Sequence, residues 1–363
     1  MTDQRSVAVD SAVDSATDWP TVLGALIRGE DLDAASTQWA MAQVFSGDAT
    51  PAQIAAFAVA LRAKGETAAE MTGLATAMLD AAHRIEVPGP AVDIVGTGGD
   101  RSHSVNISTM AALVVAGAGE RVVKHGNRAA SSNCGTADVL EELGVVLSLT
   151  PEQVAGVGVE AGITFCFAQV FHPSFRFAAG PRKEIGVATS FNFLGPLTNP
   201  AQPVAQAIGC ADLRMAPVMA QVFAERGASA LVFRGDDGLD ELTVSTTSSV
   251  WRVSGGSVEA LSLSPTRLGI GQAPIESLRG GDRSHNAAVV RALLSGEERG
   301  PIRDAVMLNA SAAFVALQDA TGQGATSLED AMALGLERAA SAIDSGAAGE
   351  ALARWVTATQ SLA

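Results

Sequence analysis

The spacing of apolar residues divides the chain into a helical amino-terminal part and a longer part of mixed character. From residue 19 to about residue 83, apolar positions such as Ile54, Phe57 and Leu61 recur at the 3.6-residue period of an amphipathic helix. Thr50-Pro51 is typical of a helix start, because Thr is a good N-cap and Pro suits the first helical position. This pattern predicts a small all-helical unit.

After residue 87 the pattern changes to short β-branched runs that alternate with helical stretches. Helices are expected around 110–115 and from about 136 to 143. Strands are expected at residues 91–95, 121–124, 163–167, 204–208 and 230–233. Such alternation favours an α/β domain with a mainly parallel central sheet. Two later runs, 244–247 and 250–253, predict a hairpin-like addition to it.

Composition agrees with two well-packed domains. The chain has 363 residues, and 47% of them are apolar while 17% are charged, so large cores can be buried. The first 17 or so residues are polar, acidic and aperiodic, which predicts a mobile tail. They contain neither the basic nor the apolar region of a signal peptide. No apolar run reaches the roughly 18 residues that a transmembrane helix needs.

Charge and cysteine content limit the partners and the compartment. A net charge of −15 argues against nucleic acid as the main partner, whereas a small anionic substrate needs only local donors or metal ions. Cys134, Cys166 and Cys210 have no zinc-site spacing, and their odd number disfavours a disulfide framework. We therefore expect a cytoplasmic protein without nucleic-acid or membrane partners.

A glycine-rich loop, GTGGD at residues 96–100, directly follows the first expected strand. Glycines let backbone N–H groups approach an anion, and the next helix adds positive potential. The loop is not a Walker A motif, and Arg101 stands where a dinucleotide fingerprint needs a third Gly. Taken alone, the loop is equally typical of a tight strand-to-helix turn.

Two further polar segments follow. Residues 106–109, NIST, precede an apolar helix and could be ordinary caps, or hydroxyl ligands of a phosphate or Mg²⁺. Residues 124–136, KHGNRAASSNCGT, gather two cations, a histidine and three hydroxyls within thirteen residues. That combination suits a polyanion such as pyrophosphate better than a plain solvated loop in an acidic protein.

Two later segments are ambiguous when each is taken alone. Around 172–184, Arg182 has the planar fork that pairs with a carboxylate, although a surface helix with salt bridges is the simpler interpretation. Residues 236–242, DDGLDEL, follow an expected strand, where neighbouring carboxylates are natural Mg²⁺ ligands or merely solvated turn residues.

Together and in this order, these segments resemble the anthranilate phosphoribosyltransferase family over residues 20–345. The matching motifs are VGTGGD (95–100), NIST (106–109), KHGNRAASS (124–132), GPLTNP (195–200) and GDDGLDEL (235–242). The resemblance implies transfer of the 5-phosphoribosyl group of 5-phosphoribosyl pyrophosphate (PRPP) to anthranilate, in tryptophan biosynthesis. It also implies a helical domain, residues 1–88 plus about 172–191, hinged to an α/β domain at 89–363, and a homodimer through the helical domains.

The resemblance assigns site residues position by position. The PRPP site would comprise Gly96, Thr97, Gly99, Asp100, Asn106, Ser108, Thr109, Lys124 and Ser132. Anthranilate would meet Gly96, Asn127, His172 and Arg182. Two Mg²⁺ ions per subunit would be held by Ser108, Asp240 and Glu241. No general base is assigned, because the aryl amine is already neutral at pH 7, and His125 is a possible late proton acceptor.

Four positions depart from the family pattern: Arg101, Gln169, Phe177 and Ala188. Arg101 could change the loop over PRPP, and Gln169 with Phe177 could reshape the acceptor channel. A paralogue acting on a substituted anthranilate therefore stays open. A pyrimidine nucleoside phosphorylase is a second possibility, which the KHGNR and DGLDE segments disfavour. A third is a catalytically silent relative that binds phosphate compounds or nucleic acid. Such a relative should have lost acidic metal ligands or gained a basic surface, and this sequence shows neither.

Overall fold

The computed structural model describes residues 17–129, 133–323 and 327–363. The expected amino-terminal tail therefore lies outside the described residues, apart from its last position. In the described ranges, no helix combines the length and the apolar character needed to cross a membrane.

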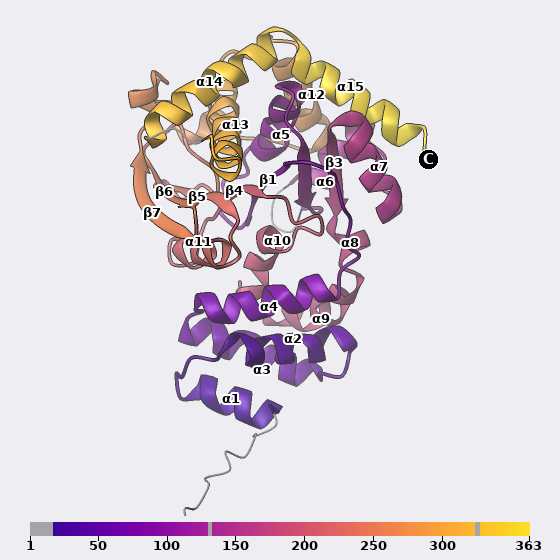
Figure 1. The fold of residues 1–363 in the computed structure, drawn as a ribbon, viewed down its shortest axis with the longest axis vertical. Helices are drawn as coiled ribbons and strands as arrows, with labels where there is room; N and C mark the ends of the chain where they lie inside the picture. Colours follow the sequence, from indigo (N-terminus) through magenta and orange to yellow (C-terminus); the bar gives the residue numbers. More distant parts are fainter. Residues whose placement is uncertain (1–16, 130–132, 324–326) are drawn as a thin grey trace, which may run out of the picture.

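Four helices form a layer at one end of the molecule: α1 (Trp19–Ile27), α2 (Ala34–Ser46), α3 (Pro51–Lys64) and α4 (Ala68–Asp80). Thr50 and Thr67 start α3 and α4 with complete capping boxes, which satisfy amides that the first turn leaves free. α2 packs on α4, and α1 packs on α3. A later helix, α9 (Arg176–Ile185), returns to this layer and packs on α3 and α2 (Figure 1).

A single seven-stranded sheet forms the centre of the larger part, in the order β3-β2-β1-β4-β5-β6-β7. Its strands are β1 (Val92–Gly96), β2 (Val122–Gly126), β3 (Ile163–Phe167), β4 (Ala205–Gly209), β5 (Ser229–Gly235), β6 (Ser248–Ser254) and β7 (Ser257–Leu263). The first five strands in this order are parallel, and β6 and β7 are antiparallel additions. The predicted fold class, a helical domain with a larger, mainly parallel α/β domain, is confirmed.

One predicted strand is wrong. Residues 244–247 form no strand, and the hairpin instead joins β6 to β7 through Gly255 and Gly256, both at positive φ. Two such residues form the tight turn that matches the twist of paired strands. β7 is largely exposed, and its apolar residues, Val258, Ala260, Leu261 and Leu263, do not alternate regularly, so the period-2 pattern that identifies a strand is weak there.

Helices cover both faces of the sheet. The remaining helices and 3₁₀ turns are α5 (Ile107–Gly117), α6 (Thr136–Glu142), α7 (Pro151–Ala161), α8 (Ala168–Phe171), η1 (Pro173–Phe175), η2 (Ser190–Phe193), α10 (Leu194–Leu197), α11 (Met215–Glu225), η3 (Pro265–Leu268), η4 (Ile275–Leu278), α12 (Arg283–Leu294), α13 (Pro301–Ala320), α14 (Leu328–Asp344) and α15 (Ala347–Gln360). α5 and α13 lie on one face, beneath α14 and α15 (Figure 1). α11 lies on the other face and packs on α4, so a continuous apolar core connects that face to the helical layer.

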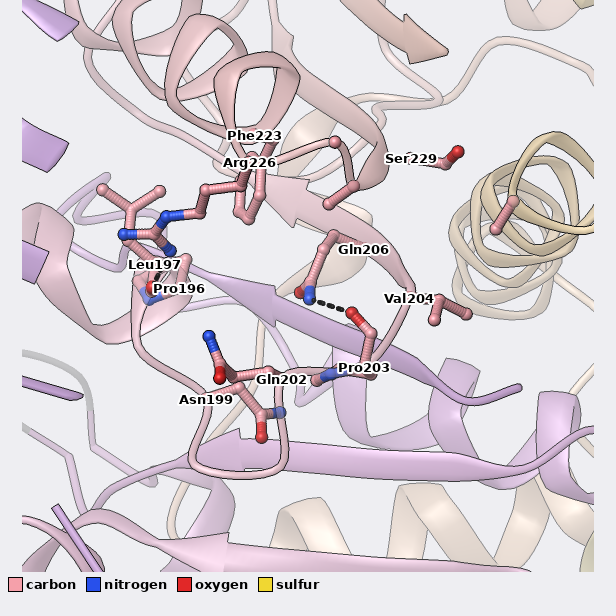
Figure 2. A pocket seen from close by; sticks show the side chains of 13 residues that line it. Pro196, Leu197, Asn199, Gln202, Pro203, Val204, Gln206, Phe223, Arg226 and Ser229 are labelled. Atoms are coloured by element: carbon pink, nitrogen blue, oxygen red, sulfur yellow. Dashed lines mark hydrogen bonds between the residues drawn. The ribbon is translucent and has the colours of Figure 1, made fainter. Parts of the chain in front are cut away.

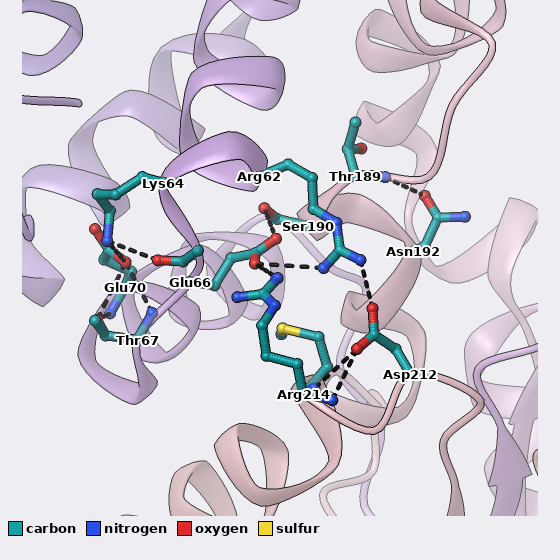
Figure 3. A network of polar contacts seen from close by, with 12 residues as sticks. Arg62, Lys64, Glu66, Thr67, Glu70, Thr189, Ser190, Asn192, Asp212 and Arg214 are labelled. Carbon is teal, nitrogen blue, oxygen red and sulfur yellow. Dashed lines mark hydrogen bonds and ion pairs between the residues drawn. The ribbon is translucent and has the colours of Figure 1, made fainter. Parts of the chain in front are cut away.

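A polar network crosses the same junction (Figure 3). Glu66, whose side chain is fully buried, forms ion pairs with Arg62 and Arg214, and it accepts a hydrogen bond from Ser190 Oγ at 2.7 Å. Arg62 also contacts Asp212, in the segment that follows β4. The network therefore fixes the end of α3 against the segment that follows β4 in the larger domain and against Ser190 of η2.

Candidate active site

The glycine-rich loop lies at the topological switch point of the sheet. From β1, the chain continues to β2 and β3 on one side, and β4 and β5 lie on the other. Crevices at the carboxyl ends of such strands are the usual ligand sites of open α/β sheets. The Thr97 amide donates to the carbonyl of Gly209, at the end of β4, at 2.9 Å, so the loop is tied across this point.

The loop needs glycine for two different reasons. Gly98 and Gly99 have φ values of 69° and 88°, in the left-handed region that glycine adopts readily. Gly96 has an ordinary φ, but a Cβ there would clash with the carboxylate of Asp240. Arg101 also has a positive φ, 60°, which is uncommon for a side-chain-bearing residue. Arg101 thus has a backbone conformation that glycine would adopt more readily.

Three carboxylates gather beside the loop. Asp240 accepts a hydrogen bond from the Gly98 amide at 2.6 Å, and both Asp240 and Glu241 are over 90% buried. Burial, with the neighbouring charge of Asp100, raises the pKa of Asp240 to about 7. Burial and the charge of Asp240 raise the pKa of Glu241 well above its usual range. Buried acids that repel one another in this way are stabilised by a cation.

The oxygen donors in this group suit a magnesium ion whose remaining ligands come from a substrate. In the described parts of the chain, no three acidic, histidine or cysteine side chains form a complete metal-binding group. Mg²⁺, however, commonly binds one or two carboxylates together with waters and substrate phosphates. Asp240, Glu241 and the Ser108 hydroxyl supply such a partial set.

Lys124 is the cation of this cluster. It is fully buried at the middle of β2, and its Nζ donates to Ser108 Oγ at 3.2 Å and to the carbonyl of Ile94. Burial lowers its pKa, while Asp93, Glu241 and Asp240 oppose that effect. Asp93 itself is fully buried in β1, and burial raises its pKa to about 6.

The NIST segment starts α5, but not by simple capping. Asn106 occupies the N-cap position without a capping hydrogen bond; its side chain donates to the carbonyl of Cys134 and accepts from Asn286. Ser108 and Thr109 lie in the first turn of the helix. The capping interpretation is therefore wrong for Asn106, whose side chain joins three segments next to the glycine loop.

An adjoining pocket of about 430 Å³ is mainly apolar and is lined by two arginines, Arg176 and Arg182. It is lined by Met78, Val95, Gly96, Thr97, His125, Gly126, Asn127, Ala168, Gln169, His172, Pro173, Phe175, Arg176, Ala179, Arg182, Phe191, Asn192, Gly195 and Pro196. Arg182 stacks on the rings of Phe175 and Phe191, at 4.9 Å and 5.7 Å from their centroids. Among the described residues, no acid forms an ion pair with Arg182, and burial lowers its pKa.

Two neutral imidazoles also line this pocket. The rings of His125 and His172 lie 5.1 Å apart, and burial lowers their pKa values to about 4 and about 3. His125 Nδ1 lies 2.9 Å from the Gly195 carbonyl and His172 Nε2 lies 3.1 Å from that of Thr198. A carbonyl only accepts, so these two nitrogens carry the protons, and the buried Nε2 of His125 is left as an acceptor.

The structure thus brings nearly all of the predicted site residues into two adjoining groups. The polar group contains Gly99, Asp100, Ser108, Lys124, Asp240 and Glu241, and it is adjoined by Asn106 and Thr109. The pocket is lined by Gly96, Thr97, His125, Asn127, His172 and Arg182. Ser132 lies outside the described residues. Gln169 lines the pocket as expected, whereas the expected influence of Phe177 is not direct, because it lies against Gly47. Ala188 is exposed and does not line the pocket.

Sequence reasoning missed several residues of the site. Phe175 and Phe191 both contact the Arg182 guanidinium, and Asp93 accepts hydrogen bonds from the His125 amide of β2 and from Asn199. A signal was present for Asp93, which is a lone acid inside an apolar strand. Such an acid is rarely buried without a partner or a function.

Comparison with known proteins matches this architecture. The model of the "Glycosyl transferase family, a/b domain" matches residues 88–349, and that of the "Glycosyl transferase family, helical bundle domain" matches residues 20–82. An anthranilate phosphoribosyltransferase of a Nocardioides species is 61% identical over 341 residues, covering 94% of this chain and 98% of its own length.

Solved structures agree. The anthranilate phosphoribosyltransferase of Thermus thermophilus superposes with a TM-score of 0.85 at 42% identity, covering 93% of this chain and 99% of its own. That of Saccharomyces cerevisiae, in complex with PRPP and Mg, has a TM-score of 0.84 at 25% identity and covers 95% of this chain and 98% of its own.

Proposed function

Because this chain belongs to the anthranilate phosphoribosyltransferase family, we propose that it transfers the 5-phosphoribosyl group of PRPP to the amine of anthranilate, in tryptophan biosynthesis. The products are N-(5-phosphoribosyl)anthranilate and pyrophosphate. The observation that carries the proposal is that two different sites adjoin. One is a mainly apolar pocket that contains Arg182, which has no ion pair among the described residues. The other is the glycine-rich loop next to Lys124, Asp240 and Glu241, and the two sites share Gly96 and Thr97.

The polar group would hold the diphosphate of PRPP. Of the Gly96–Gly99 amides, those of Thr97 and Gly98 already donate to Gly209 and Asp240, so the donors that suit phosphate oxygens are the other loop amides, the hydroxyls of Ser108 and Thr109, and the ammonium of Lys124. These groups are fixed by their surroundings, so they need little rearrangement as negative charge grows on the departing pyrophosphate.

Magnesium would complete this group. Asp240, Glu241 and Ser108 fit as its ligands, because two buried acids of raised pKa need a cation. When bound, the metal supplies positive charge that neutralises the diphosphate. We propose two ions per subunit, as the family resemblance implies, with Ser108 and Glu241 holding one ion and Asp240 and Glu241 holding the other.

The pocket would orient the acceptor. Arg182 is placed to pair with the anthranilate carboxylate, while Phe175 and Phe191 keep its guanidinium plane fixed. The amide of Asn127 and the neutral ring of His172 would contact the amine side of the ring. The amine is neutral and needs no base to attack carbon 1. His125, with its free Nε2 and a pKa of about 4, is a weak base, which suits only a late acceptance of the amine proton.

The decisive experiment is one assay in several arms. The purified chain with Mg²⁺, PRPP and anthranilate should consume the fluorescence of anthranilate and release pyrophosphate. Phosphate with thymidine should give no thymine, because that would instead identify a nucleoside phosphorylase. A ring-substituted anthranilate that reacts far faster than anthranilate itself would shift the proposal to the paralogue. No turnover with any pair would support the silent relative.

We further propose the domain division and assembly that the family implies. Residues 1–88 with about 172–191 would form the helical domain, supported by the packing of α9 on α2 and α3, and 89–363 the phosphoribosyltransferase domain. A cytoplasmic homodimer would form through the helical domains, where Ile27 is 80% exposed on α1. Sedimentation of the wild type and of Ile27→Asp tests the assembly: a monomer in both would contradict it.

A further inference from the structure

The strands β1 and β2 separate where the two parts of the site meet. β1 pairs with β4 along its whole length, from Val92 to Gly96, and β2 pairs with β3 from Val122 to Gly126. Between β1 and β2, in contrast, the described chain contains a single ladder pair, Val92 with Val122. Both strands are largely buried, so the main-chain groups beyond this pair need other hydrogen-bond partners.

The side chains of Asp93 and Asn199 bind main-chain groups of β2 that this separation leaves without a ladder partner. The amide of His125 donates to Asp93 Oδ1 at 3.0 Å. The carbonyl of Val123 accepts from Asn199 Nδ2 at 2.7 Å. The same Nδ2 donates to Asp93 Oδ2 at 2.9 Å, so the two side chains also bind each other. Asp93 is fully buried and Asn199 is 3% exposed, and the pair therefore forms a fixed polar bridge between β1 and β2.

Asn199 reaches this bridge from a separate segment of the chain. It lies in the turn between α10 and β4, where Figure 2 shows it, and its Oδ1 accepts from the Ala201 amide at 3.0 Å. This bond fixes the orientation of the side-chain amide, because the oxygen is bound within the turn and the nitrogen is left for β1 and β2. The described lining of the acceptor pocket does not include Asn199, so we expect it to touch neither reactant.

The stretch of β2 that the pair binds carries one residue of each part of the site. Neighbouring side chains of a strand point to opposite faces of the sheet. Lys124 belongs to the polar group, where its Nζ donates to Ser108 Oγ at 3.2 Å. His125 lines the acceptor pocket, and its Nδ1 donates to the Gly195 carbonyl at 2.9 Å. The position of residues 123–125 therefore sets the position of both side chains at once.

We propose that Asp93 and Asn199 are positioning residues for the reaction. By holding β2 at a fixed distance from β1, they place Lys124 at the departing diphosphate and His125 beside the acceptor. A carboxylate suits this place, because it accepts from two donors at once, one on β2 and one on Asn199. The effect on the reaction rests on the proposed function, whereas the placement of β2 by the pair does not.

Asn199→Leu is the sharpest test, because it keeps the size of the side chain and every charge of the site but removes the donor to Asp93 and Val123. We expect kcat to fall roughly 10- to 100-fold in a folded protein, since a misplacement of about 1 Å can have this effect. Thr164→Val is the matched control: it lies on β3 opposite Val123, and it removes the buried bond from Thr164 Oγ1 to the Val154 carbonyl. The control should lower the Tm but leave kcat unchanged. Equal losses of kcat in the two variants would overturn the proposal.

A reciprocal exchange tests the pair itself. Asp93→Asn alone places an amide nitrogen opposite Asn199 Nδ2, which is also a donor. Asp93→Asn combined with Asn199→Asp again sets a donor opposite an acceptor and restores the total charge. We expect the kcat of this double variant to exceed the product of the effects of Asp93→Asn and Asn199→Asp. Recovery of the Tm without recovery of kcat would show a purely structural role and would overturn the assignment.

A crystal structure of the folded Asn199→Leu protein separates this inference from the proposed function. β2 should shift so that Lys124 Nζ no longer reaches Ser108 Oγ. A Lys124 side chain that stays in place would overturn the inference, whatever the activity of the variant. If the wild type does not use anthranilate at all, the proposed function fails, but this comparison still decides whether the pair positions β2.

Discussion

Gly96 faces the carboxylate of Asp240 with no room between them for a Cβ atom. The two residues are far apart in the chain, yet the same carboxylate accepts from the Gly98 amide at 2.6 Å. The anion-binding loop and the acidic segment are therefore one structural unit, and a change on either side alters the position of the other.

Gly96→Ala should reduce turnover strongly while the protein stays folded. The new methyl group would displace Asp240 or the loop, and a shift of about 1 Å at a catalytic group can cost on the order of 100-fold in rate. Steady-state rates with PRPP and anthranilate, alongside circular dichroism, measure this. Gly180→Ala, where a Cβ meets open space on α9, is the control and should be nearly neutral. Equal rates for the two variants would contradict the close approach.

Arg182→Ala should raise the KM for anthranilate far more than the KM for PRPP. A charge-assisted hydrogen bond contributes about 1.5–3 kcal/mol, which corresponds to roughly a 10- to 100-fold change. Lys183→Ala, the exposed neighbour, should change neither KM. Equal effects of Arg182→Ala on both substrates would refute the assigned role, because they would indicate a general loss of structure.

Asp240→Asn combined with Glu241→Gln should abolish Mg²⁺-dependent turnover. The substitutions keep the size of both side chains but remove the charges that would hold the metal. Asp236→Asn with Asp237→Asn, in the turn just before them, is the matched control and should keep most of the activity. Full activity of the 240/241 variant would mean that the metal is bound elsewhere.

For the same double variant, we predict that the difference in Tm from the wild type depends on pH when no metal is present. The folded-state pKa of Asp240 is raised from 3.8 to about 7, so its contribution to stability is greatest below pH 4 and is lost as pH rises through 7. Glu241 acts in the same direction. The buried histidines have lowered pKa values, so their contribution makes stability rise between about pH 4 and pH 6.5. Both proteins contain these histidines, so their contribution cancels in the difference. The Tm of the variant minus that of the wild type should therefore grow from pH 4 to pH 8; a constant difference would show that the carboxylates are not perturbed.

Much of this arrangement could be predicted from the sequence because its signals are local. The capping box at Thr50, the β-branched run before Gly96 and the glycines of the loop each determine local conformation through their own chemistry. What could not be predicted depends on contacts between distant segments. The stacking of Arg182 on Phe191 and the bond from Asn199 to Asp93 exist only once the sheet and α9 are assembled. The exposed edge strand β7 was missed for a different reason, since its apolar residues do not follow a regular period of two.

The junction between the helical layer and the larger domain gives the last prediction. Glu66 is fully buried between Arg62 and Arg214, and it holds Ser190, the residue before Phe191 of the acceptor pocket. Removing one partner of a buried ion pair costs about 3–5 kcal/mol, and the partial exposure of both arginines reduces this to roughly 1–3 kcal/mol. Glu66→Gln should therefore lower the free energy of unfolding in urea by that amount. It should also raise the KM for anthranilate, because Phe191 supports the Arg182 guanidinium. Glu30→Gln, which affects only an exposed pair with Arg28, should change neither quantity. A Glu66→Gln protein that is destabilised but keeps the wild-type KM would show that the network stabilises the junction without positioning the acceptor pocket.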